Sequence, residues 1–201
     1  MNRKASNISN FHSKGKRTWL ACFKMAGIFL LFLLITTTHP ISARNPVPVL
    51  SIPVQIPALP GGTVTVPVHF AANGNAISTV VFSVDYDEKL LNFDPTDSNG
   101  DGIPDSVTFN LTGGFQGSVQ FNGDDTDGEL DFMIADMSPP LSSLPDREVV
   151  TIRLNAGNPR NSVNARVGFS KDPKASFGST TGKSVRGDTR DGSVHIKVKG
   201  K

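Results

Sequence analysis

The residues best suited to chemistry stand in one short acidic loop, DSNGDGIPD, at positions 97–105. Side-chain oxygens at positions 1, 3 and 5 of such a loop can converge on one cation, and a glycine at position 6 permits the sharp bend. A backbone carbonyl at position 7 and an acid at position 9 can complete the shell. Oxygen ligands of this kind suit calcium, a hard ion of flexible coordination. The spacing therefore predicts a structural calcium site made by Asp97, Asn99, Asp101, the carbonyl of Ile103, and Asp105.

One ligand of the usual twelve-residue calcium loop is missing. Thr108 stands at the twelfth position, where a bidentate acid is expected. Asp94 or the acidic stretch 124–129 could supply another carboxylate if the fold brings either one close. The competing interpretation is a solvated turn whose Asp and Asn side chains cap its own backbone.

The other chemically able residues form no recognisable catalytic group. Beyond residue 43 the histidines are His69 and His195, which fall on outward positions of predicted strands and lack the spacing of a zinc pair. No serine stands in a G-x-S-x-G turn. Asp131 and Asp136 could form the carboxylate pair of a glycosidase, but acids are common in this region and nothing singles these two out. The sequence therefore predicts a protein that is not an enzyme.

Residues 1–43 are predicted to be a secretory signal peptide. They carry six bases and no acid, with an apolar run from Ala26 to Ile35 and a small-residue exit at 41–43. The run is shorter than the roughly 20 residues of a membrane-spanning helix, and an uncleaved anchor that starts near Trp19 is the alternative. We expect a secreted protein without stable membrane insertion after cleavage, or a cell-surface protein if the segment is retained. Cys22, the single cysteine, would leave with the leader, so the mature chain would form no disulfide.

Charge beyond the leader argues against a nucleic-acid partner. The whole chain has a net charge of +2, yet residues 44–201 hold 14 bases and 18 acids. Residues 44–140 hold 13 acids and two bases, whereas residues 141–201 hold 12 bases and five acids. Solvated loops explain such an asymmetry, and a charged partner is the alternative.

Apolar residues alternate with polar ones along most of the chain beyond residue 60, a period typical of half-buried strands. Within 77–86, for example, Val80, Phe82 and Val84 share one face. The proline-rich stretch 44–60 is predicted to be a linker or a first edge strand. Many short strands without an amphipathic helix predict an all-β fold, a two-sheet antiparallel sandwich. The predicted strands are 63–70, 77–86, 107–111, 118–122, 129–136, 148–154, 163–169 and 193–198.

Three segments form a recognisable set: P-G-G-T-V-T-V-P-V at 60–68, the strand F-S-V-D-Y-D at 82–87 followed by L-L-N-F at 90–93, and the closing D-G-S-V-H-I at 191–196. Together they resemble a bacterial cohesin domain, which would span residues 50–198. The resemblance implies a nine-stranded jelly-roll sandwich related to carbohydrate-binding modules. It also implies a partner, because cohesins bind dockerins, small calcium-loaded helical modules, in polysaccharide-degrading assemblies outside the cell.

The resemblance also implies where a partner would bind. In cohesins, the sheet face that includes the strand matching 77–86 meets the dockerin. The outward positions of that strand here are Thr79, Val81, Ser83 and Asp85. Well-known cohesins often have Asn and Asp where Thr79 and Val81 stand, so a more apolar face is implied, for another dockerin class or another partner. The competing interpretation is that a neighbouring loop covers Val81.

Direct binding of polysaccharide is the second functional prediction, and a calcium-stabilised surface structural module is the third. Sandwich modules that bind sugars usually expose a row of aromatic side chains. Residues 44–201 contain one Tyr and no Trp, and their phenylalanines fall mostly at inward positions. Phe115, in the loop 113–117, is the one aromatic side chain predicted to be exposed. This shortage favours a protein partner.

Overall fold

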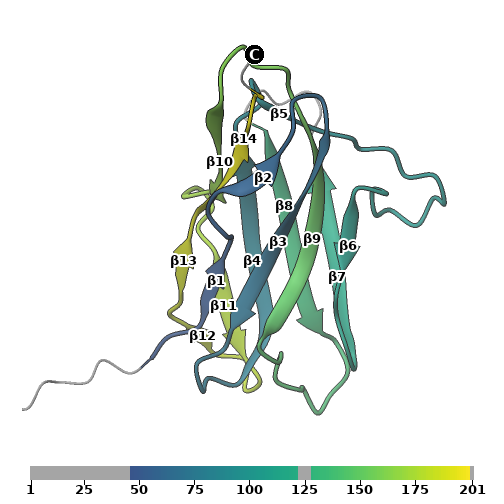
Figure 1. Cartoon of the computed structure of the whole chain (residues 1–201). Coiled ribbons are helices and arrows are strands. Elements are labelled where there is room, and N and C mark those ends of the chain that lie inside the picture. Colours follow the sequence, from purple (N-terminus) through teal and green to yellow (C-terminus); the bar gives the residue numbers. More distant parts are fainter. Residues whose placement is uncertain (1–45, 122–127, 200–201) are drawn as a thin grey trace, which may run out of the picture. The chain divides into compact units, whose positions relative to one another are not determined.

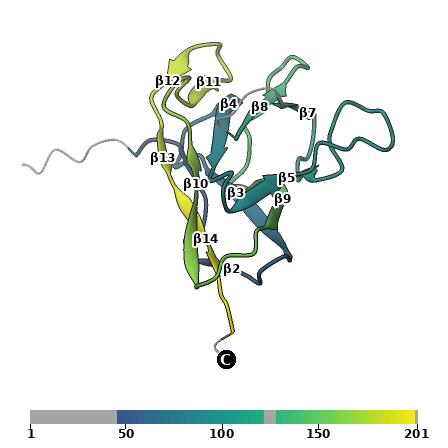
Figure 2. The ribbon, with the colours of Figure 1, turned by 90° about the horizontal axis from the view of Figure 1, so that it is seen from above.

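The computed structural model describes residues 46–121 and 128–199; the predicted leader and most of the acidic stretch 124–129 lie outside them. All regular structure in the described part is β-strand, arranged as two sheets packed on one apolar core (Figures 1 and 2). The predicted all-β sandwich is therefore confirmed. No helix of the described residues is long and apolar enough to cross a membrane.

The first sheet is built around one long antiparallel pair. Strands β3 (Thr63–Ala71) and β9 (Arg147–Ala156) pair along almost their whole length. The strand order is β13-β1-β3-β9-β5, and β6 also pairs with β9. The shorter strands of this sheet are β1 (Val49–Ser51), β5 (Leu91–Phe93), β6 (Val107–Phe109) and β13 (Asp188–Arg190).

The second sheet has β4 (Ile77–Tyr86) near its centre. One edge of β4 pairs with β8 (Glu129–Asp136), and β7 (Phe115–Phe121) pairs with the far edge of β8. The other edge of β4 is shared by two strands, β10 (Val163–Phe169) and β11 (Ser176–Ser179). The remaining strands are β2 (Ile56–Ala58), β12 (Ser184–Val185) and β14 (Gly192–Ile196).

Two strand pairs are parallel, so the sheets are mixed and not purely antiparallel as predicted. β13 runs parallel to β1, and β14 runs parallel to β2. β13 and β14 are consecutive parts of one extended segment, which changes sheet at Asp191. Both short strands of the proline-rich stretch, β1 and β2, are thus paired with the C-terminal segment of the described chain.

Alternating apolar side chains from both sheets fill the core. Phe82 of β4 and Phe132 of β8 are each 1% exposed, and their stacked rings have centroids 5.1 Å apart. Phe109 of β6 meets Phe132 edge-on at 6.2 Å and so joins the two layers. A Cβ added at Gly117 of β7 would lie 2.3 Å from the Phe109 ring, so only glycine leaves room for this ring.

Asp136 closes the inward side of β8, although it is an acid. It is 5% exposed, and its carboxylate accepts backbone hydrogen bonds from Ser142 at 2.6 Å and Ser138 at 2.9 Å. These two hydrogen bonds hold the pKa of Asp136 below its ordinary value of 3.8, and the one from Ser142 has the larger effect. The charged form of this carboxyl therefore fastens the loop that follows β8.

We expect this carboxyl to make the fold sensitive to acid. The pKa of Asp136 is lower in the folded protein than in the unfolded chain. Its contribution to the free energy of unfolding is therefore fully present at pH values above the ordinary pKa, and it is lost as the pH falls through the lowered pKa. Asp136→Asn should lower the free energy of unfolding at neutral pH and flatten its pH dependence below about pH 4. Urea unfolding at a series of pH values measures this, with Asp188→Asn, an exposed carboxyl, as the control. An unchanged pH dependence in Asp136→Asn would contradict the assignment.

Candidate functional site

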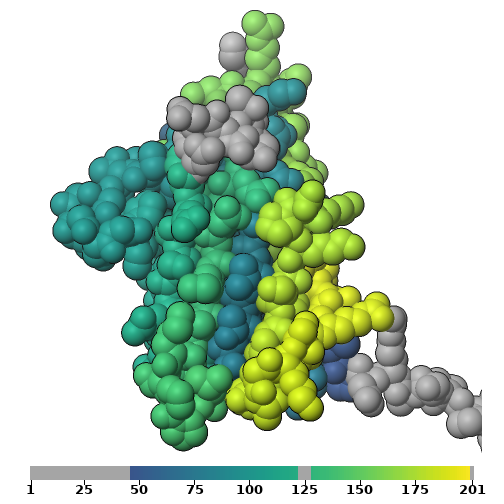
Figure 3. Space-filling view, turned by 180° about the vertical axis from the view of Figure 1, so that it is seen from behind, coloured from purple at the N-terminus to yellow at the C-terminus, as the bar shows by residue number. Residues whose placement is uncertain are grey.

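The predicted binding residues lie on the outward side of the second sheet. We call the surface made by the outward side chains of β7, β8, β4 and β11 the outer face, and Figure 3 shows it, with the blue strip of β4 between the green of β8 and the yellow-green of β11. Because residues opposite each other in a sheet point to the same side, the register determines which side chains meet there. The outer face contains Gln116, Ser118 and Gln120 of β7, Asp131 and Met133 of β8, Thr79, Val81, Ser83 and Asp85 of β4, and Ser176 of β11.

An apolar pair lies at the centre of the outer face. Val81 is opposite Met133, and each is 38% exposed. Ser176 flanks Val81 on one side, and Ser118 flanks Met133 on the other. Val81 is therefore open to solvent and is not covered by a loop. Short polar side chains around a small apolar centre make a surface that can be desolvated at modest cost.

Ser83 is placed on this face but is not exposed. It is 2% exposed, and its hydroxyl donates a hydrogen bond to the carboxylate of Asp131 on β8. The Asp131 side chain is itself exposed and lies over Ser83. A partner would therefore contact Asp131 at this point, and Ser83 would act by holding that carboxylate in place.

Asp85 lies at one end of the outer face in an ion-pair cluster. Arg166 of β10 bonds to the Asp85 carboxylate and, at 3.0 Å, to that of Asp191. The hydrogen bond to Asp85 is the main reason that the pKa of Arg166 is raised above its ordinary value. A Cβ at Gly168 would lie 2.7 Å from the Arg166 guanidinium, so this glycine leaves the space that the arginine crosses. Asp85 is thus partly neutralised before any partner binds.

The acidic loop projects from the side of the sandwich, between β5 and β6 (Figure 2). Asp97 accepts backbone hydrogen bonds from Gly100 and Gly102, both at 2.8 Å. Asn99 accepts one from Asp101 at 3.0 Å, and Asp101 accepts one from Ile103 at 2.8 Å. Ile103 packs on the core. Asp94 caps Thr96, which lowers the pKa of Asp94 through its side-chain and backbone hydrogen bonds.

The described carboxylates of this loop thus cap the loop backbone. Within residues 46–121 and 128–199 there is no group of three or more His, Cys, Asp or Glu side chains that could hold a metal ion. The Asp105 carboxylate accepts a hydrogen bond from the Ser98 N–H at 3.3 Å, so it also caps the loop backbone. The calcium site therefore stays a prediction from spacing.

The structure separates the residues considered for catalysis. Asp131 is exposed on the outer face, whereas Asp136 is buried on the inward side of the same strand, so the two cannot flank one glycosidic bond. His69 lies on β3 in the first sheet. His195 lies on β14 in the second sheet, with its Nδ1 2.7 Å from the side-chain oxygen of Asn164.

The expected exposure of Phe115 is wrong. Phe115 is the first residue of β7, opposite Asp136, and it is 9% exposed. Strand β7 begins earlier than predicted, and its register turns the ring into the core. The aromatic residue considered for stacking on a sugar is therefore not available at the surface.

Comparison with known proteins identifies the architecture. No family model matches the chain, and no curated protein is similar to it in sequence. Among solved structures, the sixth cohesin of scaffoldin B from Acetivibrio cellulolyticus, solved in complex with a Cel5 dockerin, matches with a TM-score of 0.56 at 24% identity, over 75% of this chain and 99% of the other. A type I cohesin from Pseudobacteroides cellulosolvens matches with a TM-score of 0.54 at 17% identity, over 77% and 95%.

The likeness is not confined to one class of these modules. A type II cohesin from Acetivibrio cellulolyticus matches with a TM-score of 0.55 at 15% identity, over 76% of this chain and 96% of the other. At these identities the likeness is one of fold. The described part of the chain has the fold of a cohesin module.

Proposed function

We propose that this protein is a non-catalytic binding module whose outer face docks a small protein partner of the dockerin type. The observation that carries the proposal is the exposed pair of Val81 and Met133, at the centre of a face of short polar side chains. Burial of such a centre inside a polar rim is the usual anatomy of a protein–protein interface.

The comparisons support the same kind of partner. Several of the similar structures are complexes of a cohesin with a dockerin, among them two from Acetivibrio cellulolyticus. The outer face of this chain is central in its sheet and is free of covering loops at Val81. An apolar centre in place of strongly polar side chains suggests a dockerin whose contacting helix presents apolar residues.

The proposal is tested by binding of the full chain to an array of calcium-loaded dockerins and, in parallel, to polysaccharide beads. We expect saturable binding to at least one dockerin and no retention on cellulose. Retention on a polysaccharide without binding to any dockerin would overturn the proposal. Because the partner's own calcium is needed for its fold, each dockerin is also offered in chelator as a negative control.

We also propose that the acidic loop takes up one structural calcium ion, as its spacing predicts. Saturating calcium should raise the melting temperature by about 5–10 °C, which corresponds to a ligand at about 100 times its Kd. Asp101→Ala should remove most of this gain, because Asp101 supplies the ligand at the fifth position. The comparison is made within each variant, calcium against chelator, so that loss of the Asp101 hydrogen bond to Ile103 does not enter. Equal melting curves for the unaltered protein in calcium and in chelator would contradict the site.

Export is part of the proposed function. The leader predicted at 1–43 would deliver the domain outside the cell, where cohesins and dockerins form polysaccharide-degrading assemblies. Mass spectrometry of the protein purified from culture medium should find an N-terminus close to residue 44. A cell-bound protein that retains residues 1–43 would instead identify this segment as an anchor.

A further inference from the structure

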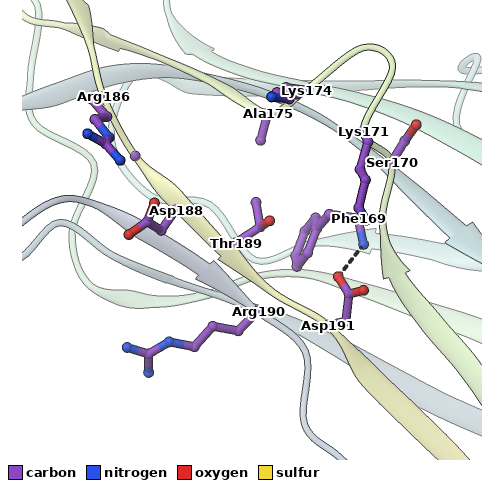
Figure 4. Close-up of a pocket in the computed structure, with 11 residues that line it drawn as sticks. Phe169, Ser170, Lys171, Lys174, Ala175, Arg186, Asp188, Thr189, Arg190 and Asp191 are labelled. Carbon is purple, nitrogen blue, oxygen red and sulfur yellow. Dashed lines mark hydrogen bonds between the residues drawn. The ribbon is translucent and has the colours of Figure 1, made fainter. Parts of the chain in front are cut away.

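A groove opens where the C-terminal segment changes sheet. Strands β10 and β14 pair from Val163 opposite Ile196 as far as Val167 opposite Gly192. Beyond this point β10 continues along β4, whereas the preceding strand β13 leaves to pair with β1. The two strands therefore separate, and a groove of about 890 Å³ lies between them (Figure 4).

The narrow end of this groove is closed by a side chain in place of a strand. The backbone N–H of Phe169 donates to the carboxylate of Asp191 at 2.9 Å, the bond drawn in Figure 4. Asp191 thus satisfies the amide that a neighbouring strand would otherwise have bonded. The rest of the groove is bordered by the turn that joins β10 to β11 and by β13.

Strand β13 pairs with β1 along one edge. Its other edge faces the groove. The N–H of Asp188 donates to Pro48 at 2.9 Å, and the carbonyl of Arg190 accepts from Ile52 at 3.0 Å. In a parallel ladder, a residue that gives both backbone groups to one neighbour alternates with a residue that turns both groups away. Thr189 is therefore the residue whose N–H and C=O point away from β1. Within the described residues, β13 is the last strand of its sheet.

The walls of the groove are mainly cationic. Lys171 and Lys174 come from the turn after β10, and Arg186 and Arg190 come from the segment around β13. All four are exposed. Two acids also line the groove, Asp188 and Asp191, and Asp191 is already engaged by Arg166 and by the Phe169 amide. Asp172 stands in the same turn but does not line the groove.

We propose that this groove binds an acidic peptide segment in extended conformation, which adds to the free edge of β13. The backbone of the peptide would pair with the N–H and C=O of Thr189, and its carboxylates would meet the four cations. Addition of a strand to an open sheet edge is a common mode of peptide recognition, in which main-chain bonds supply affinity and side chains supply selectivity. The groove adjoins the outer face at Asp85 and Ser176 but is lined by other residues, so it would allow the module to hold a second partner beside the first.

A peptide fits these observations better than an acidic polysaccharide does. The free edge offers a donor and an acceptor at the spacing of a peptide backbone. The described aromatic that lines the groove, Phe169, is 2% exposed and offers no flat ring for a sugar. Charge alone would attract either ligand, so the backbone edge decides between them.

The test uses the full chain and a short fluorescent peptide of alternating Glu and Thr, with binding measured by anisotropy. A peptide of alternating Gln and Thr is the control for charge, and the acidic peptide with alternate backbone amides N-methylated is the control for strand pairing. We expect the acidic peptide to bind and the two control peptides to bind at least tenfold more weakly. Added salt should weaken binding of the acidic peptide about tenfold, the effect of screening two exposed ion pairs.

Variants of the protein separate the two contributions. Lys171→Gln with Lys174→Gln should weaken binding about tenfold, and Arg186→Gln with Arg190→Gln should do the same. The matched control is Lys183→Gln with Arg160→Gln, two exposed cations that do not line the groove. Thr189→Pro should abolish binding, because proline removes the N–H that faces the groove, whereas Thr189→Val should retain it.

If Thr189→Pro fails to fold, the peptides still test the proposal, because they are compared on the unaltered protein. Equal binding of the methylated and unmethylated acidic peptides to the unaltered protein would overturn strand addition. Binding of polygalacturonate without binding of the peptide would identify a polysaccharide site and would also overturn it. Val81→Lys on the outer face should leave peptide binding unchanged, so failure here is distinct from failure of dockerin docking.

Discussion

Phe132→Ala is expected to lower the free energy of unfolding by about 3–5 kcal/mol. The Phe132 ring is 1% exposed, stacks on Phe82 and meets Phe109 across the layers. Truncation leaves a cavity between strands of both sheets, and paired strands cannot easily collapse into it. Because a domain of this kind is stable by about 5–15 kcal/mol, a single truncation would remove a large share. Urea unfolding followed by far-ultraviolet circular dichroism measures the change.

The neighbouring residue supplies the matched control. Met133 is adjacent in sequence but points to the outer face, where its side chain is 38% exposed. Met133→Ala should cost less than about 1 kcal/mol of stability, since little buried contact is lost. It should instead weaken binding to a dockerin. Similar losses of stability in the two variants would contradict the inward position of Phe132 and the outward position of Met133.

Val81→Lys is expected to weaken dockerin binding about 30- to 1000-fold, with little effect on the fold. The substitution places a charge at the centre of the outer face, which the partner must desolvate. A buried central position of an interface typically costs about 2–4 kcal/mol when it is disrupted, and the stated range is that cost converted to affinity. Isothermal titration with the tightest dockerin of the array measures it, and circular dichroism confirms the fold.

Two control variants make this result specific. Val81→Thr keeps the shape and the β-branch, so it should cost about tenfold or less in affinity. Thr65→Lys adds the same charge to an exposed position of β3, on the other sheet, and should leave binding unchanged. If Val81→Lys and Thr65→Lys bind equally well, the partner does not use the outer face.

Alternation along the chain was sufficient to predict the long strands. The strands 77–86, 129–136 and 163–169 begin and end at the predicted residues, because each alternates cleanly between turn residues. The short strands β11, β12 and β13 were not predicted. β11 and β12 are short, with Ser in both and Gly in β11, and β13 is polar and exposed at every residue, so no apolar period marks any of the three. β11 pairs with β4 and β13 pairs with β1, both far away in the sequence, whereas β12 pairs with its neighbour β11.

The same reason limits what could be predicted of the outer face. Outward positions of β4 follow from its period, but the period does not say which strands lie beside it. The register brings Met133 opposite Val81 and Asp131 opposite Ser83, so one predicted contact residue is joined by an apolar neighbour and another is covered by an acid. The pairing of Asp85 with Arg166, 81 residues later, likewise depends on β10 lying next to β4.

The parallel pairs at the C-terminal segment determine how the domain responds to pulling. The first and last strands of the described chain, β1 and β14, leave the sandwich toward opposite ends (Figure 1). Because β13 lies parallel to β1, tension on the two ends acts along the strands and loads several hydrogen bonds at once in shear, where an antiparallel end pair would open one bond at a time. The domain should therefore resist stretching from its two ends better than a sandwich whose end strands run antiparallel.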